Sequence, residues 1–219
     1  MADQDVFLTR HGSRIDKEDR GWLRKAGHDR HDDPHLSMAG EEQAVQLAAR
    51  MAEIHARQPL AHIVSSPFIR CMQTAKPVAE ALGLPIKVEP GICEILNVFP
   101  PGFLDAEELK RTFEAVDAAY VPAVNRAQLQ KEMGDGQAAR RAGEAARRVR
   151  GQLVGPILFV GHGASCLGVA EAFGASDYVG YASLSHFKNT GARWKLEGSL
   201  GDVSHLSEEH RRASLASAF

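Results

Sequence analysis

Two histidines, His11 and His162, each precede a glycine and follow closely on a run of apolar residues. The runs at residues 6–8 and 157–160 are typical of buried strands, so each histidine is expected at the carboxyl end of a strand. Ligands bind at that edge in open α/β sheets, and glycine lets the backbone approach an anion closely. A single histidine of this kind is best interpreted as a loop residue bonded to a backbone carbonyl. A pair at equivalent strand ends instead favours a site that takes up a phosphoryl group.

Three arginines in the same regions could bind the charge of a phosphate. Arg10 and Arg14 flank His11, and Arg70 falls in the expected first turn of a helix, where unpaired amide hydrogens and the helix dipole favour an anion. Arginine presents a planar fork of donors that matches phosphate and that lysine lacks. Any one of these arginines alone would be interpreted as a solvated surface side chain. Three beside one sheet edge predict a phosphate-binding site.

A second group of arginines is expected on a solvated helix face. Glu144 stands four residues from both Arg140 and Arg148, which is the spacing of helical ion pairs. The group consists of Arg140, Arg141, Arg147, Arg148 and Arg150.

Other residues could be interpreted as metal ligands or as a cysteine-based site. The first set is His28, Asp29, His31, Asp32, Asp33 and His35. It lies in an expected loop without a His-x3-His helix face or a cysteine partner, so a solvated loop is favoured over a metal site. Cys71, Cys93 and Cys166 are too few and scattered for a disulfide framework or a zinc ribbon, and none begins the Cys-x5-Arg pattern of cysteine phosphatases.

The composition is that of an ordinary folded domain. The 219 residues are 44% apolar and 25% charged, with a formal net charge of -2. These values predict a single domain over residues 1–219 and argue against nucleic-acid or anionic membrane partners. The sequence has no run of about 18 apolar residues, and residues 1–5 lack the apolar region of a secretory signal. We expect an intracellular, cytoplasmic protein.

Strand and helix patterns alternate along the chain, which is typical of a parallel sheet covered on both faces. The sequence therefore predicts a three-layer α/β/α sandwich with a mostly parallel central sheet. Helices are expected from a cap at Ser37 to about residue 57, from Pro67 in a first turn to a stop at Gly83, and over residues 137–153 and 165–173. Strands are expected over residues 6–8, 62–65, 85–89, 157–160, 181–187 and 190–196, and the apolar run 157–160 is expected at the centre.

Three segments depart from this alternation. The polar stretch from Arg14 to Pro34 is expected to be loop. Residues 95–135 contain two adjacent prolines and one expected short helix near 106–117, and are interpreted as an insertion that forms part of the pocket wall. The polar tail from about residue 199 is expected to be peripheral.

Several motifs carry a family resemblance. LTRHGSR, SSPFIRCMQTA and VGHGAS resemble, in order and spacing, the three core motifs of the histidine phosphatase superfamily, also called the phosphoglycerate mutase-like fold. RHGSRID, DPHLSMAGEEQA, IKVEPGICEI and VDAAYVP are similar to the phosphatase domain of the suppressor-of-T-cell-receptor-signalling and ecdysteroid-phosphate phosphatase proteins. The similarity runs from about residue 6 to residue 196. The ubiquitin-binding and SH3 domains of the larger members lie outside it.

The resemblance implies a role for each residue of the expected phosphate site. His11 becomes the nucleophile that forms a phosphohistidine. The phosphoryl oxygens are held by Arg10, Arg14, Arg70 and His162, with the amide of Gly163 as a further donor. The arginines should disfavour protonation of His11, and its second ring nitrogen should donate to a backbone carbonyl.

The resemblance also implies a general acid and a class of substrate. The acid that protonates the leaving group, and later activates water, is expected at Glu94, with Glu89 as the alternative. No cofactor or metal is required, the substrate is a small phosphate ester or a phosphopeptide, and a homodimer is compatible with related domains.

Two other functions stay open. Mutases of this superfamily typically follow the first motif with Gln-Ser-x-Trp-Asn, whereas this chain has Ser13-Arg14-Ile15-Asp16, which argues against a phosphoglycerate mutase-type phosphotransferase. A weakly active module that binds phosphorylated partners is the second alternative, although every expected catalytic position is filled.

Overall fold

A six-stranded mixed sheet forms the centre of the protein in a computed structural model, which describes residues 5–19, 21–25, 32–191 and 193–218. The strand order is β3-β2-β4-β1-β5-β6. The first four of these strands are parallel, and β5 and β6 are antiparallel. The strands are β1 (Val6–Arg10), β2 (His62–Ser65), β3 (Ile86–Val88), β4 (Ile157–Gly161), β5 (Leu184–Asn189) and β6 (Trp194–Asp202).

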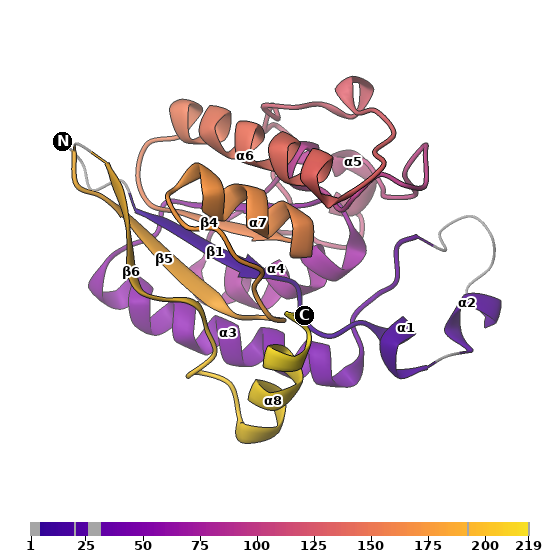
Figure 1. The fold of residues 1–219 in the computed structure, drawn as a ribbon, viewed down its shortest axis with the longest axis horizontal. Coiled ribbons are helices and arrows are strands. Elements are labelled where there is room, and N and C mark those ends of the chain that lie inside the picture. Colours follow the sequence, from indigo (N-terminus) through magenta and orange to yellow (C-terminus); the bar gives the residue numbers. More distant parts are fainter. Residues whose placement is uncertain (1–4, 20, 26–31, 192, 219) are drawn as a thin grey trace.

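Four long helices cover the two faces of the sheet (Figure 1). Helices α3 (Met38–Arg57) and α4 (Ile69–Leu82) pack together on one face. Helices α6 (Asp135–Gln152) and α7 (Gly163–Ala172) pack together on the other. The expected three-layer α/β/α sandwich with a mostly parallel sheet is therefore confirmed.

The alternation of side chains along β4 shows how the core forms. Leu158 and Val160 join the cluster that contains α3 and α4, whereas Ile157 and Phe159 join the cluster that contains α6 and α7. Successive side chains of a strand point to opposite faces, so a strand covered on both faces must be apolar throughout. The prediction that this strand is central is confirmed, because β4 pairs with both β1 and β2.

The helix ends follow the local signals of the sequence with one exception. The Ser37 side chain accepts a hydrogen bond from the backbone of Gly40 at the start of α3, and Gly83 ends α4 in the left-handed region, with a φ of 64°. The expected position of Pro67 in the first turn of α4 is wrong. Phe68 is the N-cap and the helix begins at Ile69, so Pro67 lies outside it.

The stretch expected as loop and the insertion contain shorter elements. In its described part, the loop has α1 (Ile15–Glu18) and α2 (Trp22–Lys25), each a single turn. The insertion follows η1 (Pro90–Ile92) and contains η2 (Arg126–Gln128) and α5 (Ala106–Lys110), which ends well before the expected residue 117.

The segment expected as a peripheral tail is part of the folded structure. Strand β6 extends to Asp202, and helix α8 (Glu208–Ala216) follows it. Ser214 is fully buried, and its hydroxyl donates to the carbonyl of Tyr181 at 2.6 Å. The polar composition of α8 suggested a solvated segment. The helix contacts the rest of the protein through buried polar side chains, among them His210 and Ser214.

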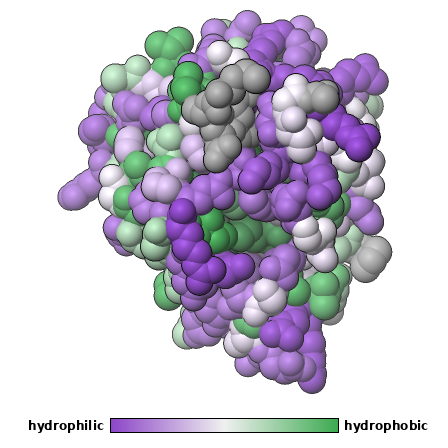
Figure 2. Space-filling view, turned by 90° about the vertical axis from the view of Figure 1, so that its left-hand side faces the viewer, coloured by the Kyte–Doolittle hydropathy of each residue, from purple (hydrophilic) through white to green (hydrophobic). Residues whose placement is uncertain are grey.

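The left-hand side of the molecule in Figure 1 carries mostly hydrophilic side chains, with hydrophobic ones in small patches between them (Figure 2). The large apolar side chains gather instead in the two clusters on either side of the sheet. Among the described residues, none of the helices is both long and apolar enough to cross a membrane.

Candidate active site

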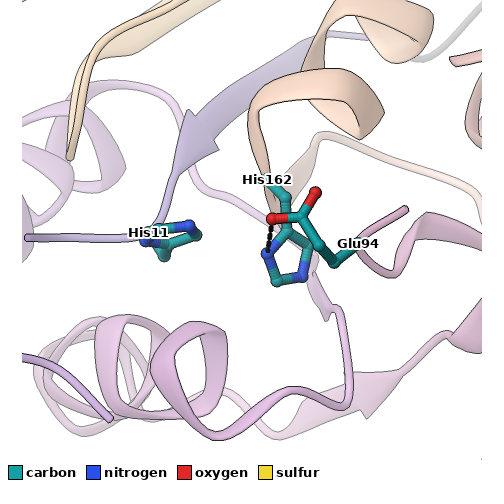
Figure 3. Close-up of side chains that lie close together, drawn as sticks. All are labelled: His11, Glu94 and His162. Atoms are coloured by element: carbon teal, nitrogen blue, oxygen red, sulfur yellow. Dashed lines mark ion pairs between the residues drawn. The ribbon is translucent and has the colours of Figure 1, made fainter. Parts of the chain in front are cut away.

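Two neighbouring parallel strands bring the two sequence-predicted histidines together. In the register of β1 and β4, Arg10 pairs with Gly161, so His11 and His162 follow at the same edge of the sheet. Their ring centroids are 5.2 Å apart. Figure 3 shows His11 just beyond the end of β1 and His162 at the start of α7, with Glu94 beside His162.

His11 is fully buried and has one bonded and one free ring nitrogen. Its Nδ1 lies 2.7 Å from the carbonyl oxygen of Gly12. A carbonyl can only accept, so Nδ1 carries the proton, as the sequence led us to expect. The other nitrogen, Nε2, is buried without a hydrogen-bond partner in the described part of the chain. Burial, together with the charges of Arg70 and Arg10, holds the pKa of His11 well below the ordinary histidine value.

The loop that carries His11 lies tightly against the start of α3. A Cβ on Gly12 would lie 2.5 Å from the carbonyl oxygen of Gly40, and a Cβ on Gly40 would lie 2.1 Å from the oxygen of Ser13. Both distances are too short for real atoms, so this close approach requires glycine on both sides. The Gly12 amide also donates to the hydroxyl of Thr74 on α4. These contacts hold the carbonyl that fixes the tautomer of His11.

Arg70 supplies buried positive charge beside the two histidines. Its side chain is 1% exposed, and Nη2 lies 3.3 Å from a carboxylate oxygen of Glu94. The charge is also offset by Asp33, 3.5 Å from Nη1. Its Nε and Nη1 make no hydrogen bond to any described residue. A buried donor without an acceptor costs about 1 to 3 kcal/mol, so this guanidinium fits an anion that would occupy those donors.

Arg10 is held by the end of the chain segment that the sequence had assigned to a peripheral tail. Its Nη1 donates to the carbonyls of Val179 and Ser217, at 3.1 and 2.8 Å. The guanidinium lies over the ring of Tyr181, 4.4 Å from its centroid, and its Nε is a further buried donor without a partner among the residues described. Gly163, the first residue of α7, lies beside this guanidinium.

Arg14 lies in the same region with part of its donors already bound. Its Nε and Nη2 donate to the two carboxylate oxygens of Asp16, at 2.9 and 2.7 Å. Burial lowers the pKa of Arg14, but the hydrogen bond and charge of Asp16 outweigh burial and raise it overall. Its positive charge also contributes to the lowered pKa of His11.

His162 forms the amino-terminal cap of α7, and its two ring nitrogens contact Ser66 and Glu94. Its Nε2 lies 2.7 Å from the hydroxyl of Ser66, and its Nδ1 lies 3.5 Å from a carboxylate oxygen of Glu94. Burial and the charges of Arg70 and His11 lower the pKa of His162 well below its ordinary value. It is therefore a neutral hydrogen-bonding group at neutral pH.

Glu94, where the general acid is expected, and Glu89, the alternative, lie in different environments. Glu94 contacts both Arg70 and His162 and stays partly exposed. Glu89 is fully buried, and its oxygens accept hydrogen bonds from the amides of Gly91, Ala123 and Val124 and from the hydroxyl of Tyr120. Burial raises the pKa of Glu89. Glu94 is thus the carboxylate beside the histidines, whereas Glu89 holds the insertion against the core.

A cavity of about 420 Å³ opens next to these groups. Arg10, Glu94 and Gly163, which the sequence analysis named, are among its lining residues. The remaining lining residues, which the sequence analysis did not single out, are Asp135, Ala164, Tyr178, Ser217 and Ala218. Tyr178 donates to a carboxylate oxygen of Asp135 at 2.7 Å. The sequence carried no signal for Ser217 and Ala218, because the polar composition of the tail concealed the contact.

The loop residues that had been weighed as metal ligands bind other parts of the protein where they are described. Asp33 accepts from the amide of Ile69 and Asp32 from that of Gly102, while His35 donates to the carbonyl of Leu36. His28, Asp29 and His31 lie outside the described residues. Within the described part, His11, Glu94 and His162 have potential ligand atoms within 4.8 Å of one another. The adjacent arginines disfavour a cation there and favour an anion.

The expectation of a solvated arginine face on α6 is wrong for two of its members. Arg141 donates to both carboxylate oxygens of Glu132 and to three backbone carbonyls, and is 13% exposed. Arg150 is also buried and donates to the carbonyl of Leu153. The expected helical ion pair between Arg148 and Glu144 is present.

Comparison with known proteins decides the family. A sequence profile described as "Histidine phosphatase superfamily (branch 1)" matches residues 6–199. The chain belongs to the histidine phosphatase superfamily. The match runs from β1 into β6 and includes all the candidate site residues named from the sequence.

Two other known proteins resemble parts of the chain in sequence. Ubiquitin-associated and SH3 domain-containing protein A of Mus musculus is 29% identical over 162 residues, which cover 59% of this chain and 26% of the mouse protein. A probable phosphoglycerate mutase of Yersinia enterocolitica is 33% identical over 90 residues, which cover 41% of this chain and 37% of that protein. The matched regions thus span well under half of these relatives.

Solved structures share the histidine phosphatase fold. The ecdysone phosphate phosphatase of Bombix mori, in complex with tungstate, aligns with a TM-score of 0.72 and 22% identity over 89% of this chain and 92% of that chain. A phosphoserine phosphatase mutant of Entamoeba histolytica, in complex with phosphoserine, aligns with a TM-score of 0.61 and 17% identity over 93% and 99% of the two chains.

Proposed function

We propose that the protein is a phosphomonoesterase that works through a phosphohistidine on His11. Membership of the histidine phosphatase superfamily supports phosphoester hydrolysis. The observation that carries the phosphohistidine step is the buried Nε2 of a neutral His11, which has no partner among the described residues while Nδ1 is bonded to a carbonyl. That nitrogen has a lone pair available for attack, and unpaired arginine donors lie around it.

The first half of the reaction transfers the phosphoryl group to the protein. The lone pair of His11 Nε2 attacks phosphorus, and the bond between phosphorus and the ester oxygen breaks. The leaving alkoxide takes the proton of the Glu94 carboxylic acid, which lies beside His162 and Arg70. Arg10, Arg14, Arg70, His162 and the amide of Gly163 hold the phosphoryl oxygens. Such positioning and charge stabilisation supply most of the acceleration of phosphoryl transfer.

The second half returns the protein to its starting state. Glu94, now a carboxylate, accepts a proton from a water molecule, and the hydroxide oxygen attacks phosphorus. The bond between phosphorus and nitrogen breaks, its electron pair returns to His11 Nε2, and inorganic phosphate leaves. No metal ion takes part, since the arginines supply the positive charge.

The substrate is a phosphate ester whose alcohol part fits the cavity next to the site. A cavity of about 420 Å³ falls within the range of small-molecule sites, and it opens beside Arg10 and Glu94. Both a small phosphate ester and the side chain of a phosphopeptide would present their leaving oxygen to Glu94 in this arrangement.

The proposal is tested by hydrolysis of p-nitrophenyl phosphate by the wild-type protein and by His11→Ala, with His62→Ala as the matched control. His62 lies in β2 at the opposite end from the site, where it bonds to Val154. The wild type and His62→Ala are expected to be active and His11→Ala to lose activity. An alkaline quench should trap a phosphorylated peptide that contains His11, because phosphohistidine survives in base.

Three results would overturn the proposal. Equal activity of the wild type and His11→Ala would rule out His11 as the nucleophile. Faster phosphoryl transfer to 3-phosphoglycerate than to water would identify a mutase. Tight binding of phosphopeptides without turnover, across a panel of phosphate esters, would identify a binding module.

A further inference from the structure

The loop that carries Glu94 is held from behind by one arginine side chain. Arg141, on α6, donates through Nη1 to the carbonyls of Gly91 and Cys93, at 2.9 and 3.2 Å, and through Nη2 to the carbonyl of Glu94 itself, at 3.1 Å. Its side chain is 13% exposed. A planar guanidinium with several donors can fix three carbonyls at once, which a flexible lysine cannot do.

Glu132 completes this arrangement from the end of the insertion. Its two carboxylate oxygens accept from Nε and Nη2 of Arg141, both at 2.8 Å, and the carboxylate is 8% exposed. The same carboxylate accepts from the amide of Leu96 at 3.0 Å, and the amide of Glu132 donates to the carbonyl of Leu96 at 3.0 Å. The loop from Gly91 to Leu96 is therefore bound on both sides of Glu94 by one buried ion pair.

We propose that Arg141 and Glu132 are positioning residues that hold Glu94 in place to give its proton to the leaving group. This inference rests on the proposed function, in which Glu94 is the general acid. Proton transfer requires the acid to lie within hydrogen-bond distance of the ester oxygen, so a small displacement of the loop removes the benefit. The contacts of Glu94 with Arg70 and His162 orient its carboxylate, and Arg141 fixes the backbone from which it extends.

The pair also connects the pocket wall to the acid. Leu96 lies at the start of the insertion and Glu132 near its end, so their mutual hydrogen bonds close the base of the insertion. A displacement of Glu132 would therefore also displace the backbone of Glu94, because the guanidinium of Arg141 bonds to both residues.

The test uses substituted phenyl phosphates that are similar in shape and differ in the basicity of the phenol. A good leaving group such as p-nitrophenolate needs little protonation, whereas unsubstituted phenolate needs more. The value of kcat/KM for each ester reports only the first half of the reaction. Its dependence on phenol basicity measures the contribution of the acid, and a merely structural role would not change that dependence.

We expect Arg141→Gln to reproduce the behaviour of Glu94→Gln. For phenyl phosphate, kcat/KM should fall about 10-fold or more, and for p-nitrophenyl phosphate less than about 3-fold, because general acid catalysis contributes roughly 100-fold to 10,000-fold. Arg141→Lys should recover little, since one ammonium cannot bind three carbonyls. The control is Arg148→Gln on the same helix, whose exposed side chain pairs with Glu144, and it should leave the dependence unchanged.

A second variant distinguishes a loss of positioning from a loss of stability. Arg141→Gln leaves the buried carboxylate of Glu132 without its charged partner, whereas the double variant Arg141→Gln/Glu132→Gln leaves no unpaired charge. If the double variant is stable by thermal unfolding and still shows the steeper dependence on phenol basicity, positioning is supported. An equal loss on every ester, or no loss, overturns it.

The outcome separates this inference from the proposed function. If His11→Ala is inactive but Glu94→Gln keeps the wild-type dependence on phenol basicity, Glu94 is not the acid and the positioning role falls, while the phosphohistidine stands. If Glu94→Gln has a steeper dependence on phenol basicity than the wild type and Arg141→Gln does not, only the positioning role is overturned. If His11→Ala is active, the proposed function itself fails.

Discussion

The ring of His162 lies edge-on to the ring of His11, with 5.2 Å between their centroids and 62° between their planes. The parallel register of β1 and β4 sets this arrangement, because it aligns the residues that precede the two histidines. Each ring is fully buried, and burial is the main cause of the lowered pKa of both histidines, with the charge of His11 a further cause for His162. The pair therefore presents nitrogen lone pairs and N–H groups rather than charge, among arginines that carry the charge.

The two neutral histidines make the stability of the protein depend on pH. The pKa of each is lowered in the folded state, so below about pH 6.5 the unfolded chain binds protons that the folded protein does not. The free energy of unfolding should therefore fall as the pH drops from about 7 to about 5, and it should fall less for His11→Asn than for the wild type. Urea unfolding over this range measures both. Parallel curves for the two proteins would contradict the lowered pKa of His11.

Inorganic phosphate should stabilise the protein through its unpaired donors. Nε of Arg70 and Nε of Arg10 are buried donors without hydrogen-bond partners among the described residues, and Nη1 of Arg70 has only an ion-pair contact, to Asp33 at 3.5 Å. At a phosphate concentration about 100 times Kd, binding would add about 2.7 kcal/mol and raise Tm. Arg70→Gln should abolish most of this rise, and the exposed Arg140→Gln should keep it. A phosphate effect of the same size in all three proteins would show that the anion binds elsewhere.

Glu89→Gln should affect stability rather than proton transfer. The amide group of glutamine would face the amide hydrogens of Ala123 and Val124, so at least one buried donor loses its acceptor, at a cost of about 1 to 3 kcal/mol. The dependence of kcat/KM on leaving-group basicity should stay that of the wild type. A steeper dependence with unchanged Tm would reverse the assignment of Glu89 and Glu94.

Gly180→Ala should weaken binding at the proposed phosphate site by moving α8. A Cβ at this position would lie 2.3 Å from the carbonyl oxygen of Ser214, so α8 must move and carry the carbonyl of Ser217 away from Arg10. Phosphate affinity should fall about tenfold or more, given how steeply such sites depend on geometry. Gly136→Ala is the control, since its Cβ meets no atom within 4 Å. Unchanged phosphate binding in a folded Gly180→Ala protein would show that Arg10 does not depend on α8.

Removal of divalent metals should leave the activity unchanged. His11, Glu94 and His162 come close enough to be ligands, but burial and the charges of Arg70 and Arg10 lower the pKa of both histidines, and the same positive charges disfavour a cation. The measurement is kcat/KM after incubation with EDTA and dialysis. Loss of activity that a divalent metal restores would contradict the expectation.

The sheet and the pairing of the histidines could be predicted because their signals are local. A short apolar run followed closely by histidine and glycine marks a strand end, and two such runs in parallel strands must end at one edge. The Ser37 cap and the Gly83 stop likewise depend only on the backbone next to them.

The contacts of Arg141 and α8 could not be predicted because their partners are distant in sequence. The helical spacing around Arg148 correctly indicates a solvated pair, but it carries no information on whether the insertion covers the neighbouring face where Arg141 lies. The sequence favoured Glu94 over Glu89 only through the family resemblance, because three of the four groups that donate to Glu89 lie more than thirty positions along the chain.

The hydrogen bond from Arg10 to Ser217 joins residues 207 positions apart. During synthesis, His11 and Arg10 emerge from the ribosome early, but the carbonyl that orients Arg10 does not exist until α8 has been made. Contacts of such wide separation form late and slowly in folding. A nascent chain thus holds the proposed nucleophile from the outset and completes the proposed phosphate site only once α8 has been made, so we expect the onset of activity to follow the docking of α8.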